Sequence, residues 1–404
     1  MGRVVITGMG CVTAMGNDVA AFGASLFAGR SGIRASSEPA DGLHFTRTAT
    51  VEGFRGEDWL LAGQRPVADR TAAFAVAAAR QAVTQSGVVA AHPGESVAVV
   101  FGCSAGGRAT EEQEAKRLYV GNARLHPLTV PRIMANAGTS LVAMEYGLTG
   151  PSLTLSTACA SGTHAVGLAF HMIRAGMVQA ALAGGHEAPL SLAFLRAWDS
   201  LHVVSPTACR PFARDRDGMT LGEGAAVFAL EERQGARARG AEILGEIVGF
   251  GMSSDAHHIT QPDPGGPAAA MRRALEDAGA RPEEVGYINA HGTGTDTNDR
   301  VEAEAIHRVF GERGRHLPIS STKGLHGHAI GASGAIELLA TVLALGEGVL
   351  PANGCLAETG GFEPDPALGL DGLLTAPSQA QVGLALSNSF AFGGMNAVLA
   401  ARPG

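Results

Sequence analysis

The chain has 404 residues, of which 46% are hydrophobic and 17% are charged, and its formal net charge is −8. This composition supports a large buried core and excludes an intrinsically disordered chain. No run of Lys or Arg is present that would bind a phosphate backbone, so we expect no nucleic-acid partner. The five cysteines are widely spaced without CxxC pairs, which predicts a reducing compartment and no zinc or disulfide framework.

The predicted elements alternate between apolar strands and Ala-rich helices. The N-terminal run RVVITG is typical of a strand followed by a turn, not of a secretion signal. Two amphipathic helices are predicted within 69–87 and 265–285, each ending at a glycine. The alternation indicates α/β layers whose strands are buried on both faces. The further predicted strands lie within 96–102, 152–158, 179–185, 242–251, 285–290, 317–322 and 382–389.

The domain organisation follows from a change of composition at the charged segment 231–244, after which predicted strands and helices alternate again. This predicts two similarly built halves, residues 1–240 and 241–404, in one compact body. The longest apolar helical run, 336–345, is too short to cross a bilayer. We therefore expect a soluble cytoplasmic protein with no membrane partner.

Four loops that contain glycine each follow a predicted strand. They contain Cys159, HGTGT (291–295), KGLHGH (323–328) and FAFGG (390–394). Because α/β sheets build their sites at the carboxyl ends of the strands, we expect these loops to share one cleft.

The residue types in these loops suit thioester chemistry. Cys159 directly precedes a predicted helix start, whose dipole would lower the thiol pKa; the alternative is an inert buried cysteine. His291 and His328 as neutral imidazoles would donate hydrogen bonds to a thioester carbonyl and a nascent enolate, unless each is merely structural. Lys323, one of only two lysines, would tune these charges, and Glu337 would neutralise it; the alternative is an ordinary ion pair.

No carboxylate general base is evident beside the thiol. Loss of CO2 generates a carbanion without proton abstraction, so this absence favours a decarboxylating reaction. The cysteine would hold one acyl group as a thioester while the enolate attacks it.

The motifs together resemble the elongating β-ketoacyl-[acyl carrier protein] synthases with a Cys-His-His site. The resemblance extends from residue 3 to about residue 400. It implies a thiolase fold, in which two pseudo-equivalent halves form a five-layer αβαβα body that is usually dimeric. The motifs that carry it are VVITGMG, TACASG, RPFARDRDGMTLGEGA, HGTGT, STKGLHGHAIGASGAIE and NSFAFGGMN.

The resemblance also implies a reaction and residue roles. The reaction is the decarboxylative Claisen condensation of a cysteine-bound acyl group with malonyl-[acyl carrier protein], in fatty acid or in polyketide and polyene elongation. The implied roles are nucleophile for Cys159, malonyl binding for His291 and His328, support for Lys323, Glu337 and Asp299, an oxyanion hole from the N–H groups of Cys159 and Phe392, and a gate at Phe390, Ala391 and Phe392.

Departures from the family pattern point to a specialised synthase. Ala391 replaces a gate glycine, Met395 stands where Thr is usual, and Ala213 where Asp commonly follows RPF. In the predicted acyl pocket, Ala105 replaces a bulky aliphatic residue, and Met134 lies in an atypical segment at the pocket end. We expect extension of polyketide or polyene chains beside a chain-length partner.

The implied partners are an acyl carrier protein and a second subunit, so that the assembly is a homodimer or a heterodimer with a chain-length-factor-like protein. Arg65 and Arg70 are the predicted carrier-docking residues, or else part of a solvated helix face. We expect no metal and no cofactor beyond the phosphopantetheine arm of the carrier.

Two other functions compete with this one. GCSAG (102–106) fits G-x-S-x-G, so that Ser104 could serve a serine hydrolase. The chain could also be a catalytically inactive chain-length partner, although such partners in this family have lost the cysteine that this chain keeps.

Overall fold

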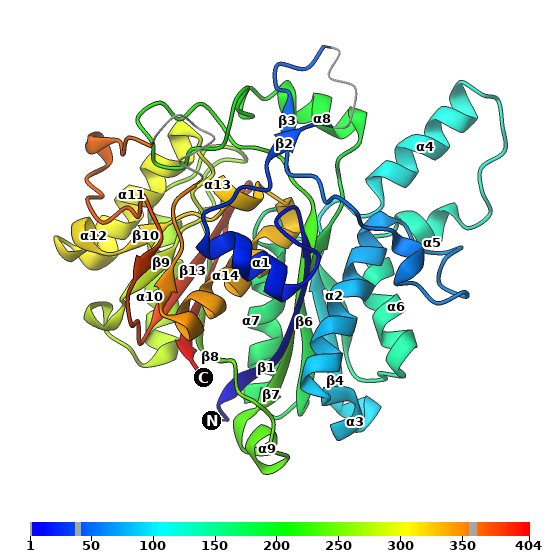
Figure 1. Cartoon of the computed structure of the whole chain (residues 1–404), viewed down its shortest axis with the longest axis horizontal. Coiled ribbons are helices and arrows are strands. Elements are labelled where there is room, and N and C mark those ends of the chain that lie inside the picture. The colour runs from blue at the N-terminus through cyan, green and yellow to red at the C-terminus, as the bar shows by residue number, and fades with distance from the viewer. Residues whose placement is uncertain (1, 37–41, 355–361) are drawn as a thin grey trace.

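The computed structural model describes residues 2–36, 42–354 and 362–404 (Figure 1). Its centre is a mixed ten-stranded sheet. In spatial order the strands are β10 (Ile319–Ser320), β9 (Tyr287–Asn289), β13 (Ala385–Ala391), β14 (Met395–Pro403), β8 (Gly245–Ser254), β1 (Val4–Thr13), β7 (Gly224–Glu232), β6 (Ala180–Glu187), β4 (Val97–Gly102) and β5 (Ser152–Leu155).

The sheet consists of two five-stranded halves with the same strand pattern. In the first half, β1, β7 and β6 are antiparallel neighbours, and β4 and β5 continue in parallel. In the second half, β8, β14 and β13 are antiparallel, and β9 and β10 continue in parallel. The halves join where Val4–Ile6 of β1 pairs with Gly245–Ile247 of β8. The repeated pattern agrees with two similarly built halves; the boundary at residue 240 stays a prediction.

Helices divide this body into five layers. The helices α7 (Ser161–Arg174) and α14 (Ser333–Glu347) pack against each other and against strands of both halves. The helix α2 (Arg70–Ser86) covers the outer face of the first half, and α10 (Gly265–Ala278) covers that of the second, with α11 (Asp296–Phe310) beside it. The predicted αβαβα arrangement is therefore confirmed.

Most strands of the sheet are buried on both faces, as predicted, whereas the edge strand β5 is partly exposed. Every residue of β1 and β4 is buried, because helices pack on both sides of the first half. The predicted helices end at Gly87 and Gly279, whose left-handed φ angles of 64° and 60° close α2 and α10. Close packing also uses Gly10, since a Cβ there would lie 2.0 Å from the Ala78 carbonyl oxygen of α2.

The central helix is longer than the apolar run 336–345 indicated. Residues 330–347 form an 18-residue stretch with a mean hydropathy of 1.4, long and apolar enough by composition to cross a membrane. However, 83% of that stretch is buried inside the protein. Its apolar character is therefore explained by its place between the two half-sheets.

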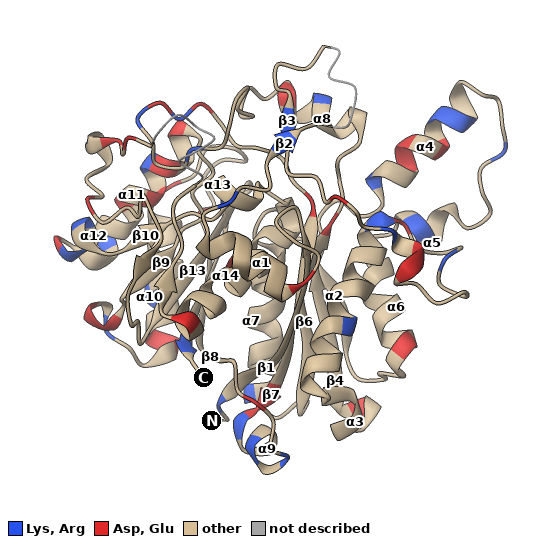
Figure 2. Ribbon diagram, viewed as in Figure 1, with Lys and Arg blue, Asp and Glu red and all other residues tan. Residues whose placement is uncertain are grey.

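Most of the remaining helices and strands lie around this body, whereas α13 (Lys323–His326) is buried within it. Figure 1 shows α4 extending away from it, and Figure 2 shows charged residues gathered on outer elements such as α4, α9, α11 and α12. The remaining elements are α1 (Val19–Phe27), β2 (Arg34–Ala35), β3 (Arg47–Thr48), α3 (Val88–Ala91), α4 (Arg108–Tyr119), α5 (Thr129–Ile133), α6 (Ala137–Tyr146), α8 (Leu192–Asp199), α9 (Arg233–Ala238), α12 (Arg313–His316), α13 (Lys323–His326), β11 (Val349–Leu350) and β12 (Ser378–Gln379).

Candidate active site

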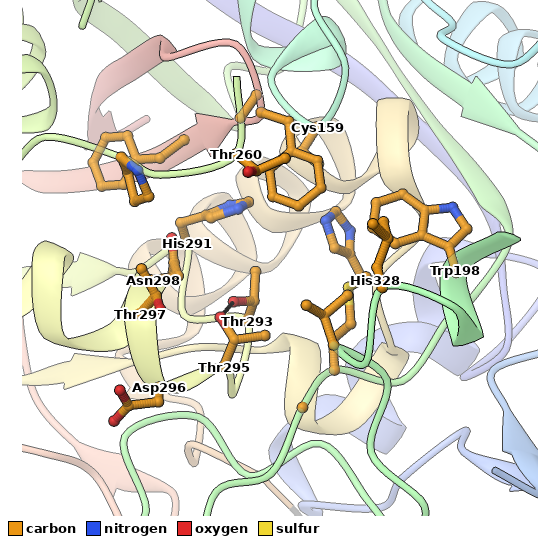
Figure 3. A pocket seen from close by; sticks show the side chains of 18 of the residues that line it. Cys159, Trp198, Thr260, His291, Thr293, Thr295, Asp296, Thr297, Asn298 and His328 are labelled. Atoms are coloured by element: carbon orange, nitrogen blue, oxygen red, sulfur yellow. Dashed lines mark hydrogen bonds between the residues drawn. The ribbon is translucent and has the colours of Figure 1, made fainter. Parts of the chain in front are cut away.

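The predicted loops meet at a cavity of about 440 Å³. Cys159, His291 and His328 all line it, and one potential ligand atom from each lies within 4.8 Å of the others. Figure 3 shows both imidazole rings directed toward the interior of the cavity, with Trp198 next to His328. Residues 159, 291 and 328 are thus brought together from both halves of the chain.

Cys159 lies in a strained turn just before α7. The preceding Ala158 has a left-handed φ of 48°, which is costly for a residue with a Cβ. The Ser161 hydroxyl stabilises this turn by donating to the Ala158 carbonyl at 2.7 Å and accepting from the Thr157 N–H at 2.9 Å. The thiol is thereby held at the mouth of the helix, with only 6% of Cys159 exposed.

The expectation of a lowered thiol pKa is wrong for this resting site. Burial raises the pKa of Cys159 to about 11 and outweighs the nearby Lys323 ammonium, which lowers it. The backbone N–H groups of Cys159 and Phe392 also contact the sulfur and lower its pKa. These are the two groups predicted to form the oxyanion hole, and they converge on the same atom.

His291 is held through a buried lysine. The Lys323 Nζ lies 3.1 Å from Nδ1 of His291 and donates to its carbonyl oxygen at 2.7 Å. It also forms an ion pair with Glu337, and both side chains are fully buried. An ammonium has three donors and no acceptor, so Nδ1 of His291 must accept. The proton of the neutral ring therefore lies on Nε2.

His328 has the same tautomer for a different reason. Its Nδ1 accepts from the Ile330 N–H at 3.2 Å and lies 2.8 Å from the Ser333 hydroxyl. Burial, and then the Lys323 charge, hold the pKa of both His291 and His328 well below the usual value. The site thus contains two neutral rings whose free N–H donors belong to Nε2.

The Cys-His-His group has the composition of a metal site, but its hydrogen bonds do not suit one. A metal bound at Nε2 would need the ring proton on Nδ1. In His291 and His328, however, Nδ1 already faces a donor, and the Lys323 ammonium lies next to the group. The arrangement instead suits a developing oxyanion, to which both Nε2–H groups can donate.

Two buried carboxylates support the His291 loop. Asp299 accepts from the N–H groups of Phe212 at 2.7 Å and Gly294 at 3.2 Å, and burial raises its pKa to about 7. Glu302 accepts from the N–H groups of His291 at 2.9 Å and Gly292 at 2.7 Å. Asp299 was predicted from the sequence and Glu302 was not, although the spacing of three residues places both on one face of α11.

The predicted gate is the hairpin between β13 and β14. Phe390 is buried with its ring 6.0 Å from that of His291, and Ala391 also lines the cavity. Phe392 is 38% exposed and stacks on Trp198 with a ring distance of 5.7 Å. Trp198 was not predicted from the sequence, although it is one of only two tryptophans in the chain.

Other predicted residues lie outside the cavity. Ala105 and Met134 do not line it, so their acyl-pocket role stays a prediction. Arg65 is exposed and donates to the carbonyls of Glu57 and Leu60. Arg70 forms a bidentate ion pair with buried Glu223, and the carrier-docking role of both arginines stays a prediction.

Ser104 does not belong to a hydrolase triad. Its hydroxyl donates to Glu187 at 2.6 Å, and among the residues that the structure describes no histidine hydrogen-bonds to it. The G-x-S-x-G match is therefore incidental.

The opposing effects of Lys323 and Glu337 on the thiol predict opposite changes in reactivity. Lys323→Met should raise the pKa of Cys159 and slow its alkylation by iodoacetamide at pH 8, whereas Glu337→Gln should lower the pKa and speed alkylation. In the unaltered protein the rate should keep rising up to about pH 10, because the thiol pKa is about 11. Alkylation followed by intact mass, with circular dichroism as the folding control, checks this; changes of the same sign in both variants would contradict it.

Comparisons with known proteins agree with this geometry. Family models described as Beta-ketoacyl synthase, N-terminal domain, and Beta-ketoacyl synthase, C-terminal domain, match residues 1–236 and 244–356. Nodulation protein E of Rhizobium sp. (strain N33) is 42% identical, over 99% of this chain and 99% of that protein. 3-Oxoacyl-[acyl-carrier-protein] synthase 2 of Synechocystis sp. (strain ATCC 27184 / PCC 6803 / Kazusa) is 39% identical, with 98% of this chain and 97% of that protein covered. The solved structure of the ishigamide ketosynthase/chain length factor is 34% identical and superposes with a TM-score of 0.94. The match covers 100% of this chain and 99% of the chain in that structure. The chain therefore belongs to the β-ketoacyl synthase family.

Proposed function

We propose that this β-ketoacyl synthase condenses an acyl group held on Cys159 with malonyl-[acyl carrier protein]. The observation that carries the proposal is the approach of the thiol and the two imidazoles to within 4.8 Å in one buried cavity. Placing reacting groups in such a geometry removes much of the entropic cost of a bimolecular reaction.

The first half-reaction is acyl transfer. The Cys159 sulfur attacks the thioester carbonyl of an acyl carrier, the new C–S bond forms, and the carrier thiol leaves with the cysteine proton. The N–H groups of Cys159 and Phe392, which converge on the sulfur, stabilise the tetrahedral oxyanion. Because the resting thiol is protonated, we expect this step to be slow without the carrier bound.

The second half-reaction is decarboxylation and condensation. The malonyl C–C bond breaks, CO2 leaves, and the electron pair becomes an enolate whose oxygen accepts from Nε2–H of His291 and His328. The enolate carbon then attacks the Cys159 thioester, so that a C–C bond forms and the C–S bond breaks. Neutral imidazoles suit this step because they donate without first protonating the carbanion.

The gate residues are proposed to separate the two half-reactions. Phe390 lies against His291, and Phe392, which also lines the cavity, stacks on Trp198. Figure 3 shows Trp198 next to His328. Displacing Phe392 breaks its stack on Trp198, so the tryptophan favours the closed gate.

We propose that acyl groups arrive on the phosphopantetheine arm of an acyl carrier protein, and that no other cofactor takes part. The name of the Synechocystis relative supports the carrier as substrate. A cytoplasmic location is proposed as well, and the four described cysteines, all free thiols, are compatible with a reducing compartment.

The natural substrate is proposed to be a specialised polyketide or polyene chain. The similarity to the solved ishigamide ketosynthase/chain length factor supports this assignment. The small Ala105 and the altered gate residues Ala391 and Met395 are compatible with a non-standard acyl group. The role of an inactive partner subunit is disfavoured, because Cys159, His291 and His328 are all present.

A second subunit is proposed to pair with the first half of the chain. Within the described residues β5 is an edge strand whose single partner is β4, and its Leu153 is 41% exposed. Nearby elements α4 to α6 expose further apolar side chains, a surface that a stable monomer rarely presents. These side chains are Leu118, Tyr119, Val120, Leu125, Val130, Met134 and Met144.

Separate assays of the two half-reactions test the reaction. Cys159→Ala should abolish acylation and condensation yet still release CO2 from malonyl-[acyl carrier protein]. His291→Ala and His328→Ala should each lower CO2 release by about 100- to 1,000-fold, because each removes one oxyanion donor. Intact mass follows acylation, and trapped CO2 follows decarboxylation. Failure of the unaltered chain to acylate Cys159 from any acyl carrier in a broad panel would contradict the proposal.

The proposed subunit interface at the β5 edge can be tested separately. Leu153→Arg introduces a charge on the β5 edge and should convert a dimer into monomers, whereas Met177→Arg at another exposed site should not. Light scattering after size exclusion measures the mass. Mass spectrometry of the dimer distinguishes two copies of this chain from one copy with a chain-length-factor-like partner; a dimer that persists in Leu153→Arg would rule out this edge.

A further inference from the structure

A buried carboxylate outside the proposed catalytic set connects two loops near the active site. Glu187 is the last residue of β6 and is fully buried. The described chain offers it no ion-pair partner; instead, five hydrogen-bond donors point at its two oxygens. Oε1 accepts from Cys103 Sγ at 3.3 Å and the Ala105 N–H at 3.0 Å. Oε2 accepts from the Ser104 N–H at 2.8 Å and hydroxyl at 2.6 Å, and from the Gly331 N–H at 3.2 Å.

The donors belong to two separate segments. Residues 103–105 follow β4, and Gly331 belongs to the loop 328–333 that carries His328. That loop is short and strained, since Ile330 has a left-handed φ of 44°. It orients the catalytic ring, because the Ile330 N–H and the Ser333 hydroxyl both contact Nδ1 of His328.

We propose that Glu187 is a positioning residue for His328, which fixes the strained loop 328–333 against the segment 103–105. This inference rests on the proposed function. One carboxylate thus couples the imidazole that donates to the enolate with Ala105 of the predicted acyl pocket.

The donor pattern requires a carboxylate. Each oxygen faces at least two donors, so an amide in either orientation would turn its NH2 group toward N–H, O–H or S–H groups. Burial raises the pKa of Glu187, while the hydrogen bonds from Ser104, Ala105 and Cys103 lower it by favouring the charged form. There is also no spare room at the contact, because a Cβ on Gly331 would lie 2.6 Å from Oε2.

The chain offers a matched control. Glu231 is equally buried and lies at the opposite end of the same strand pair, where it faces Ala180, while Glu187 faces Gly224. Its contacts are to Thr7, His92 and Arg239, away from both catalytic histidines. Glu231→Gln therefore tests the cost of altering a buried carboxylate without disturbing the site.

The experiment compares Glu187→Gln with Glu231→Gln. In Glu187→Gln, kcat for CO2 release from malonyl-[acyl carrier protein] should fall about 10- to 100-fold, with KM and the rate of Cys159 alkylation little changed, because only His328 is misplaced. The ¹⁵N resonances of His328 should shift in the same variant. Glu231→Gln should retain the kcat of the unaltered protein even where it lowers the unfolding midpoint.

A second variant guards against misfolding. Gly331→Ala pushes on Oε2 from the other side and should lower kcat in the same way. Normal kcat in a folded Glu187→Gln protein, or equal losses in decarboxylation and alkylation that match those of Glu231→Gln, would overturn the inference. Absence of decarboxylation in the unaltered protein would instead overturn the proposed function.

Discussion

The site depends on one buried ammonium. Lys323 is fully buried, and its three N–H donors are directed to Nδ1 of His291, the His291 carbonyl and Glu337. This contact fixes the tautomer of His291, helps to keep both imidazoles neutral, and partly offsets the burial that raises the thiol pKa. A cation here thus acts without touching the reacting atoms, by setting which nitrogen of His291 carries the proton and by helping to keep both rings neutral.

Three strained turns surround the cavity, and a buried polar side chain stabilises each of them. Ala158, Phe212 and Ile330 all have left-handed φ angles, of 48°, 61° and 44°. Ser161 donates to the Ala158 carbonyl, Asp299 accepts from the Phe212 N–H, and Glu187 accepts from the N–H that follows Ile330. A strained backbone conformation of this kind persists only where the surrounding contacts hold it in place. The two halves of the fold supply those surroundings, because α7 and α14 bring the cysteine and the His328 loop to one place.

The αβαβα layering was implied by the resemblance to the synthase family. Local patterns were sufficient to predict the strands, the two outer helices and the convergence of Cys159, His291 and His328. Those features depend on hydrophobic periodicity, on glycines at the ends of helices and strands, and on loops that follow strands. The thiol pKa could not be predicted in this way, because a helix start is visible in sequence and the desolvation of Cys159 is not. Glu187, Glu302 and Trp198 were missed for a related reason. Their contact partners either lie far away in the sequence or belong to no recognisable motif. The ion pair of Arg70 with Glu223 could not be predicted either, because the two residues are far apart in the sequence.

The most direct test of the central claim is ¹⁵N NMR of protein labelled at histidine, with signals assigned by the His291→Ala and His328→Ala variants. At neutral pH we expect both rings to be uncharged and to carry the proton on Nε2. Detection of an Nδ1–H tautomer or of imidazolium at either position would contradict it.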